Sequence, residues 1–211
     1  MPATGELYLI AAPSGAGKTS LIKALLERRR GLALSVSDTT RPARRGEVEG
    51  EQYHFVDRAT FEQGIEDGLY LEHADVFGNY YGTRRDRVAG LREDGFDVLL
   101  EIDVQGAVQV RHHFPDVCTI FVLPPSMDAL ADRLQQRGLD EPAVIERRLR
   151  EAVREIEACR DFHWMVVNDD FEQAVEELVA VVTAWPLRRA RQDARVAKLL
   201  DESAGRSTIR D

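Results

Sequence analysis

The stretch Ala12-Pro13-Ser14-Gly15-Ala16-Gly17-Lys18-Thr19 decides the fold of this chain. It follows an apolar run, Leu7 to Ala11, that predicts a buried strand, and it precedes a pattern from Ser20 to Arg30 that predicts a helix. Successive backbone N–H groups in such a turn, together with the start of the helix, form a concave anion site that glycine allows an anion to approach closely. The stretch therefore predicts a phosphate-binding loop, or P-loop, between a strand and a helix.

The side chains of this loop have expected roles in binding ATP. Lys18 would reach the β and γ phosphates, and the Thr19 hydroxyl would ligate Mg²⁺. The first glycine of the usual pattern is replaced by Ala12, whereas Gly15 and Gly17 remain. A glycine-rich turn with a chance lysine is the alternative, but strand, loop, lysine and helix are all in register. The expected ATP contacts in this region are Ala12, Pro13, Ser14, Gly15, Ala16, Gly17, Lys18, Thr19 and Ser20.

The rest of the chain alternates short apolar runs with helical patterns. Further runs that predict strands lie at 32–36, 98–102, 119–123 and 165–167. This alternation predicts an α/β fold, a P-loop NTPase-like parallel sheet with helices on both faces. The stretch 53–83 breaks the alternation and predicts a small inserted lobe with antiparallel strands. The helical patterns at 127–136 and 143–159 predict two further helices.

Composition limits the class of protein. Hydrophobic residues make up 44% and charged residues 31% of the 211 residues, which is typical of a globular domain. No apolar run approaches the roughly 20 residues of a membrane span, and the first residues do not resemble a secretory signal. Cys118 and Cys159 have no metal-ligand spacing, and we expect them to be reduced in the cytoplasm. The net charge of −9 argues against nucleic acid as a partner.

An acidic element follows the predicted strand at 98–102. The strand carries Glu101, and Asp103 comes directly after it. In P-loop proteins an acid at this place holds the water shell of Mg²⁺, so we expect Thr19 and Asp103 to bind Mg²⁺, partly through water. Because apolar strands often end in Asp, this prediction depends on the presence of the P-loop.

An arginine-rich loop lies between the second strand and the lobe. Residues 37–47 read Ser-Asp-Thr-Thr-Arg-Pro-Ala-Arg-Arg-Gly-Glu, with three arginines within five residues. Guanidinium forks match phosphate oxygens bidentately, although a solvated basic turn is the simpler interpretation of this loop taken alone. Tyr53-His54-Phe55, Glu72 and Gly78-Asn79-Tyr80-Tyr81-Gly82-Thr83 follow in order. We do not expect the full series by chance.

Over about residues 5–186 the sequence resembles guanylate kinases. The resemblance covers the P-loop, the Thr-Thr-Arg-x-x-Arg-x-Gly-Glu loop, the Gly-Asn-Tyr-Tyr-Gly-Thr segment, the Ile-Asp-x-Gln-Gly strand end and Val-Asn-Asp at 167–169. The form of the P-loop is similar to that of certain bacterial members. Pro42 stands one residue before the family's usual place, and Glu101 stands where Asp is common. The resemblance implies ATP-dependent phosphorylation of GMP and dGMP in purine metabolism, with Mg²⁺ as cofactor.

The resemblance also implies which residues bind GMP. Arg41, Arg44, Tyr53 and Tyr81 would bind its phosphate. Ser37, Glu72 and Thr83 would surround the base, with Glu101 or Asp103 nearby, and the choice between these two acids is left open. The full implied set is Ser37, Arg41, Arg44, Tyr53, Glu72, Gly78, Tyr81, Gly82, Thr83, Glu101, Asp103 and Arg148.

The chemistry of guanine agrees with this assignment. Its N1–H and N2–H₂ are adjacent donors, and one carboxylate such as Glu72 accepts both. Its O6 is an acceptor, to which the Ser37 and Thr83 hydroxyls can donate. In adenine N1 is an acceptor and there is no 2-amino group, so a buried carboxylate left unpaired would reject it.

A helical lid with arginines is the third implied part of the site. Arg133 and Arg137 lie four apart and share one helix face. The resemblance singles out Arg133, Arg137 and Arg148 as lid arginines that neutralise transition-state charge and exclude water, and it puts Asn168 near the adenine of ATP. The implied catalytic residues are Lys18, Arg41, Arg137 and Arg148. No histidine has a role, because the attacking phosphate oxygen of GMP is already anionic near neutral pH.

These expectations divide the chain into a P-loop core (1–36, 84–125 and 158–186), a GMP-binding lobe (37–83), a lid (126–157) and a basic C-terminal helix or tail (187–211). The tail predicts a solvated helix or a subunit contact, in a monomer or a homo-oligomer. Two alternatives remain. A non-enzymatic scaffold module would typically have a damaged P-loop, whereas Lys18-Thr19 is intact. A kinase for phosphorylated ribose would lack Arg44 and the Arg45-Gly46-Glu47 element.

Overall fold

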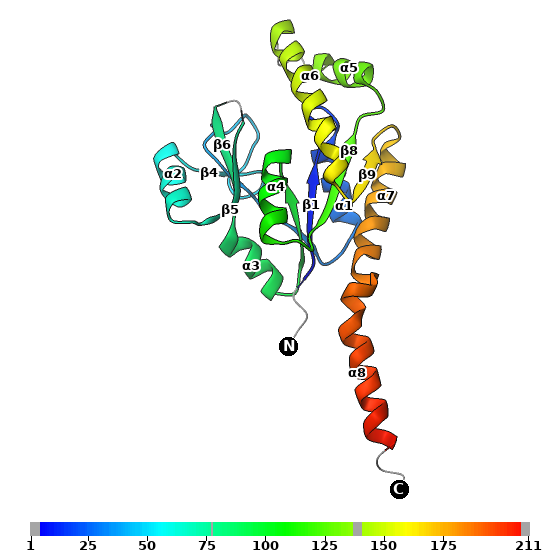
Figure 1. Cartoon of the computed structure of the whole chain (residues 1–211). Helices are drawn as coiled ribbons and strands as arrows, with labels where there is room; N and C mark the ends of the chain where they lie inside the picture. The colour runs from blue at the N-terminus through cyan, green and yellow to red at the C-terminus, as the bar shows by residue number, and fades with distance from the viewer. Residues whose placement is uncertain (1–4, 77, 137–140, 208–211) are drawn as a thin grey trace.

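A five-stranded parallel sheet forms the centre of the protein in a computed structural model that describes residues 5–76, 78–136 and 141–207. Its strand order is β2-β7-β1-β8-β9, and every neighbouring pair is parallel (Figure 1). The strands are β1 (Leu7–Ala11), β2 (Leu32–Leu34), β7 (Asp97–Glu101), β8 (Cys118–Leu123) and β9 (Trp164–Val167). Because β1 is the middle strand, the loop that follows it emerges at the centre of the carboxyl edge of the sheet.

The residues of β1 alternate between two cores, because successive side chains of a strand point to opposite faces. Tyr8 and Ile10 are buried with residues of α1 and α7, whereas Leu7 and Leu9 are buried with residues of α3 and α4. The helices on the first face are α1 (Lys18–Arg28) and α7 (Phe171–Ala184), and those on the second are α3 (Arg85–Glu93) and α4 (Val104–His113). The predicted α/β class, with helices on both faces of a parallel sheet, is confirmed.

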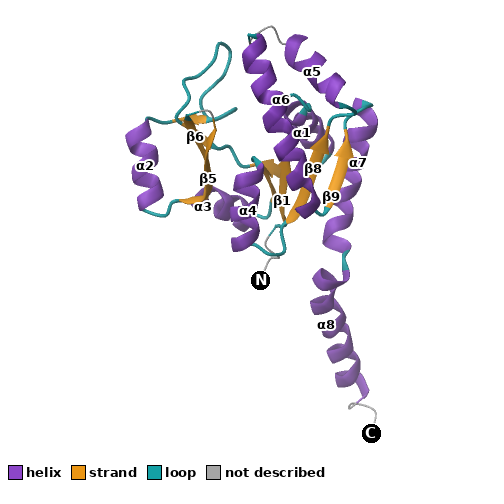
Figure 2. Ribbon diagram, turned by 45° about the horizontal axis from the view of Figure 1, so that its top comes forward, coloured by secondary structure: helices purple, strands orange, loops and turns teal. Residues whose placement is uncertain are grey.

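A second, smaller sheet lies beside the first (Figure 2). Its order is β4-β3-β6-β5, from β3 (Asp38–Thr39), β4 (His54–Phe55), β5 (Tyr70–Val76) and β6 (Asn79–Arg84), with α2 (Arg58–Glu66) between β4 and β5. β6 is antiparallel to both β5 and β3, as predicted for the lobe. β3 and β4 run parallel, so the sheet is mixed. The sequence did not indicate this parallel pair. Phe61 of α2 stacks on Tyr70 and Tyr80, at centroid distances of 4.3 and 5.2 Å, and fixes α2 to the sheet.

Two helices follow β8 and lie next to the loop after β1. They are α5 (Met127–Gln136) and α6 (Pro142–Glu157), and the short 3-10 helix η1 (Ala158–Asp161) leads from α6 to β9. Leu130, Leu134 and Ala152 are fully buried between the two helices, with Ile145 and Leu149 packed against them. This small core is separate from the two cores of the central sheet.

The chain ends in a helix that extends away from the rest of the molecule (Figure 1). After η2 (Trp185–Leu187) comes α8 (Arg189–Ser207). The guanidinium of Arg188 lies 3.9 Å from the centroid of the Trp185 ring, and Arg188 and Arg191 form ion pairs with Glu6 at 3.6 and 3.0 Å. Farther along α8, the side chains of Val196, Leu199 and Leu200 are exposed. Within the described parts of the chain, no helix has the length and apolar character needed to cross a membrane.

Candidate functional site

Two glycines shape the loop after β1. Gly15 has φ 97° and Gly17 has φ 93°, values in the left-handed region that side chains disfavour. A Cβ at Gly15 would lie 2.9 Å from Leu130 Cδ1, and a Cβ at Gly17 would lie 2.4 Å from Asn168 Nδ2. Both glycines are therefore required by backbone conformation and by space. Gly17 is the N-cap of α1 and makes no side-chain cap, so the start of α1 can receive an anion.

Asn168 supports this loop from the end of β9. Its Nδ2 donates to the carbonyl oxygen of Ala16 at 2.7 Å, and its side chain is buried. Its backbone N–H donates to Leu123 of β8, and its carbonyl oxygen accepts from the Arg133 guanidinium of α5 at 2.9 Å. Asn168 thus joins the P-loop to β8 and to α5. The contact with adenine that the sequence suggested stays a prediction.

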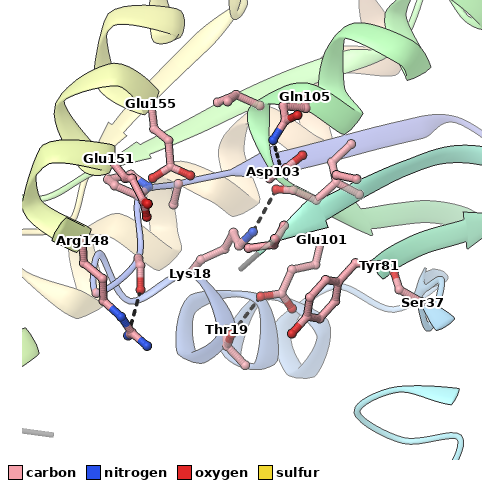
Figure 3. Close-up of a pocket in the computed structure, with 18 of the residues that line it drawn as sticks. Lys18, Thr19, Ser37, Tyr81, Glu101, Asp103, Gln105, Arg148, Glu151 and Glu155 are labelled. Carbon is pink, nitrogen blue, oxygen red and sulfur yellow. Dashed lines mark hydrogen bonds between the residues drawn. The ribbon is translucent and has the colours of Figure 1, made fainter. Parts of the chain in front are cut away.

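Lys18 and Thr19 contact the end of the neighbouring strand β7 (Figure 3). Lys18 Nζ donates to the carbonyl oxygen of Ile102 at 2.9 Å. The Thr19 hydroxyl donates to Glu101 Oε1 at 2.8 Å. The carboxyl edges of β1 and β7 therefore bring a cation, a hydroxyl and a carboxylate together beside the anion site.

Asp103, which we expect to bind Mg²⁺ with Thr19 partly through water, lies at the start of the helix after β7. It is the N-cap of α4: its Oδ1 accepts from the backbone N–H of Gly106 at 2.8 Å, and its Oδ2 accepts from Gln105 Nε2 at 3.3 Å. The acid in hydrogen-bond contact with Thr19 is Glu101. A magnesium ion commonly takes one or two protein oxygens and fills its remaining positions with water and phosphate oxygens, and this donor set fits that need. In the described segments, no three His, Cys, Asp or Glu residues group closely enough to hold a metal by themselves.

A buried carboxylate lies deeper in the site. Glu72 of β5 is only 4% exposed, and its Oε1 accepts from the Thr83 hydroxyl of β6 at 2.6 Å. The Ser37 hydroxyl lies 3.5 Å from that of Thr83. Burial raises the pKa of Glu72 to about 7, and the negative charge of Asp103 adds to this, whereas the bond from Thr83 opposes it. This arrangement suits a ligand that presents hydrogen-bond donors to the carboxylate and a hydrogen-bond acceptor to the hydroxyls.

The arginine-rich loop is organised by Glu47. Arg41 donates through both terminal nitrogens to the Glu47 carboxylate, at 3.0 and 2.8 Å, and its Nε donates to the Tyr81 hydroxyl at 3.2 Å. These bonds from Arg41 lower the pKa of Glu47. The Tyr53 and Tyr81 rings meet edge to face at 5.6 Å, and the Arg41 guanidinium lies 5.4 Å from the Tyr53 ring centroid. The Arg44 backbone N–H also donates to Glu47, at 2.7 Å, while the Arg44 side chain is exposed.

One cavity of about 670 Å³ joins these parts. The expected residues that line it are Ala12, Pro13, Ser14, Gly15, Gly17, Lys18, Thr19, Ser20, Ser37, Tyr53, Glu72, Tyr81, Glu101, Asp103 and Arg148. The expected residues outside its lining are Ala16, Arg41, Arg44, Gly78, Gly82, Thr83, Arg133 and Asn168. Ala16 and Gly82 are next to lining residues in the sequence, Arg41 and Thr83 are hydrogen-bonded to the lining residues Tyr81 and Glu72, and Asn168 lies against Gly17. Arg137 lies outside the described residues.

The family model for guanylate kinase matches residues 4–185. The chain belongs to the guanylate kinase family. It is 51% identical over 198 residues to the guanylate kinase of Thiobacillus denitrificans, covering 94% of this chain and 95% of that protein. It is 50% identical over 201 residues to the guanylate kinase of Alkalilimnicola ehrlichii, covering 95% and 99%. The crystal structure of guanylate kinase from Anaplasma phagocytophilum superposes with a TM-score of 0.75 at 33% identity, covering 90% of this chain and 92% of the other.

Two of the arginines expected in a lid lie on different helices of this guanylate kinase family member, Arg133 on α5 and Arg148 on α6. The Arg148 guanidinium of α6 lies 3.5 Å from the Ser14 hydroxyl of the P-loop (Figure 3). Arg133 of α5 contacts the loop indirectly, through the carbonyl oxygen of Asn168. α6 therefore contacts the P-loop directly, and α5 is linked to it through Asn168.

Nine residues of the cavity wall were not among the expected site residues: Ala74, Asp75, Val76, Ile102, Val104, Gln105, Glu151, Arg154 and Glu155. Three of them, Glu151, Arg154 and Glu155, belong to α6. Figure 3 shows Glu151 and Glu155 on the same helix as Arg148. Burial raises the pKa of Glu155 to about 7, and the positive charge of Lys18 opposes this shift. Positions 148, 151 and 155 share one helix face by their spacing of three and four, so the face that carries Arg148 could have indicated the two acids.

Proposed function

We propose that this chain transfers the γ-phosphoryl group of ATP to GMP or dGMP, which yields ADP and GDP or dGDP. One observation carries the proposal: the P-loop and the buried carboxylate of Glu72 line the same cavity. The P-loop suits the triphosphate of the donor, and Glu72 suits the base of the acceptor. Membership of the guanylate kinase family supports the same reaction.

For the donor, the triphosphate would lie in the P-loop against the start of α1. Residues 12–20 would supply backbone N–H groups, and Lys18 would neutralise the β and γ phosphates. Its present bond to the Ile102 carbonyl oxygen holds the amino group at the edge of the cavity. Arg133, Arg137 and Arg148 would surround the transferring group from the lid, and Asn168 would lie near adenine.

For the acceptor, guanine would present N1–H and N2–H₂ to Glu72 and O6 to the hydroxyls of Ser37 and Thr83. The burial of Glu72 supports this, because a charged carboxylate at 4% exposure needs strong donors. The nucleotide's phosphate would bind to Arg41, Arg44, Tyr53 and Tyr81. Other residues proposed at the GMP site are Gly78, Gly82, Glu101, Asp103 and Arg148.

Magnesium is the proposed cofactor. Thr19 and Glu101 would hold it at the edge of β7, and Asp103 would act through water. When bound, Mg²⁺ neutralises charge on the donor phosphates. The residues of the chain would do the rest: the P-loop orients the donor, Arg41 and the tyrosines orient the acceptor, and the lid excludes water. A general base is not needed, since the attacking phosphate oxygen is already anionic.

The proposed division of labour follows the two sheets and the paired helices. We infer a P-loop core (1–36, 84–125 and 158–186), a GMP-binding lobe (37–83), a lid (126–157) and a basic C-terminal helix or tail (187–211). We further infer a cytoplasmic enzyme, monomeric or homo-oligomeric, that binds neither nucleic acid nor membrane.

The proposal is tested by coupling ADP production to a set of acceptors. The purified chain with Mg-ATP should phosphorylate GMP and dGMP, and AMP, UMP and ribose 1,5-bisphosphate should be poor acceptors. Omitting Mg²⁺ should remove the activity. Equal use of AMP and GMP, or a preference for the ribose bisphosphate, would rule out the proposed acceptor.

A further inference from the structure

A buried glycine opens the first turn of α4. Gly106 is the third residue of this helix, and its backbone N–H donates to Asp103 Oδ1 at 2.8 Å. Glycine is disfavoured in helices because it loses the most conformational freedom on folding. The φ of Gly106 is not positive, so its backbone conformation is open to any residue. Backbone conformation therefore does not explain a glycine at this position.

The explanation lies in the space beside it. A Cβ at Gly106 would lie 2.4 Å from Glu72 Oε2, 3.0 Å from Glu72 Cδ and 3.4 Å from Asp103 Oδ1. Real Cβ atoms essentially never approach another atom within 3.0 Å. The carboxylate of Glu72 thus occupies the volume that any other residue at position 106 would need.

Glu72 is not free to move aside. Its Oε1 is held by the Thr83 hydroxyl at 2.6 Å, and the residue is 4% exposed. A side chain of α4 also holds this helix against the backbone of β5 beside Glu72. Gln109, three residues after Gly106, donates to the carbonyl oxygen of His73 at 2.8 Å and accepts from the His73 N–H at 3.2 Å. An added methyl group would therefore displace the carboxylate rather than separate the helix from the strand.

We propose that Gly106 is a positioning residue for base recognition, because its missing side chain creates the place in which the Glu72 carboxylate is held. This inference rests on the proposed function, in which Glu72 accepts from guanine N1–H and N2–H₂. Selectivity for a 2-aminopurine then depends on a residue that does not touch the nucleotide. The start of α4 also favours negative charge beside Gly106, which assists the ionised form of Glu72.

The chain offers a matched control in α3. Gly90 is also a helical glycine, and a Cβ there would meet nothing within 4 Å. Gly90→Ala and Gly106→Ala make the same chemical change in the same kind of element. The two variants differ in their surroundings, because only the new methyl group at position 106 would meet the Glu72 carboxylate.

The experiment measures kcat and KM for GMP, IMP and ATP in both variants. Gly106→Ala should lower kcat/KM for GMP by up to about 100-fold, the scale expected for a recognition group misplaced by 1 Å. It should lower the GMP-to-IMP preference, because IMP lacks the 2-amino group, and it should leave KM for ATP unchanged. Gly90→Ala should match the wild type. In a Glu72→Ala background, Gly106→Ala should cause no further loss.

Each other outcome has a defined meaning. A wild-type GMP-to-IMP preference in folded Gly106→Ala, or an equal loss with and without Glu72, would overturn the inference. If Gly106→Ala does not fold, Glu72→Ala in the same chain should restore folding by removing the clash, and a failure to restore it would also overturn the inference. A wild-type protein that does not use GMP would instead contradict the proposed function itself.

Discussion

Lys18 Nζ and the carbonyl oxygen of Ile102 lie 2.9 Å apart, across the gap between the P-loop and the end of β7. The contact holds the amino group at the cavity wall, where a phosphate would replace or join the carbonyl as its partner. It joins two neighbouring strands at the carboxyl edge of the sheet, and it uses only the backbone carbonyl of Ile102, whose side chain belongs to a hydrophobic core. We therefore expect the charge of Lys18 to serve ligand binding rather than folding.

Lys18→Met should reduce phosphoryl transfer by at least about 100-fold and leave the protein folded. Loss of one preorganised charge on a transition state typically costs about 10²–10³-fold in kcat. Steady-state kinetics with Mg-ATP and GMP measures the effect, and circular dichroism with a thermal melt verifies the fold. Near-normal turnover in the folded variant would rule out the P-loop assignment.

Glu72→Gln should impair GMP use selectively. The change keeps the shape but replaces one acceptor oxygen with an NH₂ donor that faces another donor. The expected cost is roughly 2–4 kcal/mol, since bonds to charged groups contribute about 1.5–3 kcal/mol and an unpaired buried group adds to this. At about 1.4 kcal/mol per tenfold, kcat/KM for GMP should fall about 30- to 1000-fold.

The same variant carries its own controls. KM for ATP should hardly change, because Glu72 belongs to β5 of the smaller sheet, whereas most of the proposed ATP contacts belong to the P-loop. The loss should be smaller for IMP, which has no 2-amino group. Equal damage to ATP binding and GMP use would show that Glu72 does not read the base, and Ser37, Thr83, Glu101 or Asp103 would then have to do so.

The stability of the protein should depend on pH through Glu72. Its pKa rises from the ordinary 4.5 to about 7 on folding, because burial disfavours the charged form. The folded protein therefore keeps the Glu72 proton at pH values at which the unfolded chain has lost it. The stability that this group contributes is fully present below pH 4.5 and is lost as the pH rises through 7. Relative to Glu72→Gln, the wild type should lose about 3 kcal/mol between pH 4.5 and 8. Urea unfolding of both proteins at several pH values measures this difference, and a pH-independent difference would contradict it.

Binding of GMP should weaken as the pH falls below 7. Protonated Glu72 cannot accept from both guanine donors, so binding must first remove the proton. KM for GMP should then rise by up to about tenfold per pH unit below the pKa. The phosphate of GMP also titrates in this range and adds to the pH dependence of KM. The Glu72→Gln variant keeps the part that comes from the phosphate and lacks the part that comes from the Glu72 carboxyl group. Parallel pH profiles for the two proteins would argue against a role for the Glu72 proton.

Asn168→Ala should loosen the P-loop and leave the guanine site intact. The variant removes the donor that holds the Ala16 carbonyl oxygen at 2.7 Å. Leaving a buried group unpaired costs about 1–3 kcal/mol, so KM for ATP should rise about 5- to 100-fold, with little change for GMP. Asn168→Asp keeps the shape without the donor and should behave alike. An unchanged KM for ATP in both variants would mean that the loop does not need this support.

The P-loop and the class of fold were predictable because their signals are local. Residues 12–19 carry their glycines, lysine and threonine in one continuous stretch, and Leu7–Ala11 is apolar at every position. The acid that contacts Thr19 was not predicted: the sequence pointed to Asp103 for Mg²⁺, whereas Glu101, two residues earlier, makes the contact. Cap geometry separates them: Asp103 caps α4, and Glu101 is free to turn toward Thr19.

Other features were out of reach for local patterns. β3 is only two residues long, and it pairs with β6, which lies more than forty positions later in the chain. A strand this short has no periodic pattern that would predict it. Glu155 looks like one more charge on a solvated helix until α6 is packed beside the P-loop. The reason for Gly106 likewise lies in Glu72, which a sequence pattern does not connect with it.

The bond from Asn168 to Ala16 spans 152 positions of the chain. β1 is flanked by β7 and β8, so its own pairing must also wait for residues beyond 97 and 118. During synthesis the P-loop leaves the ribosome early but lacks its support until most of the protein has followed. We therefore expect that ATP does not stabilise early folding intermediates and that the chain acquires nucleotide binding late in folding.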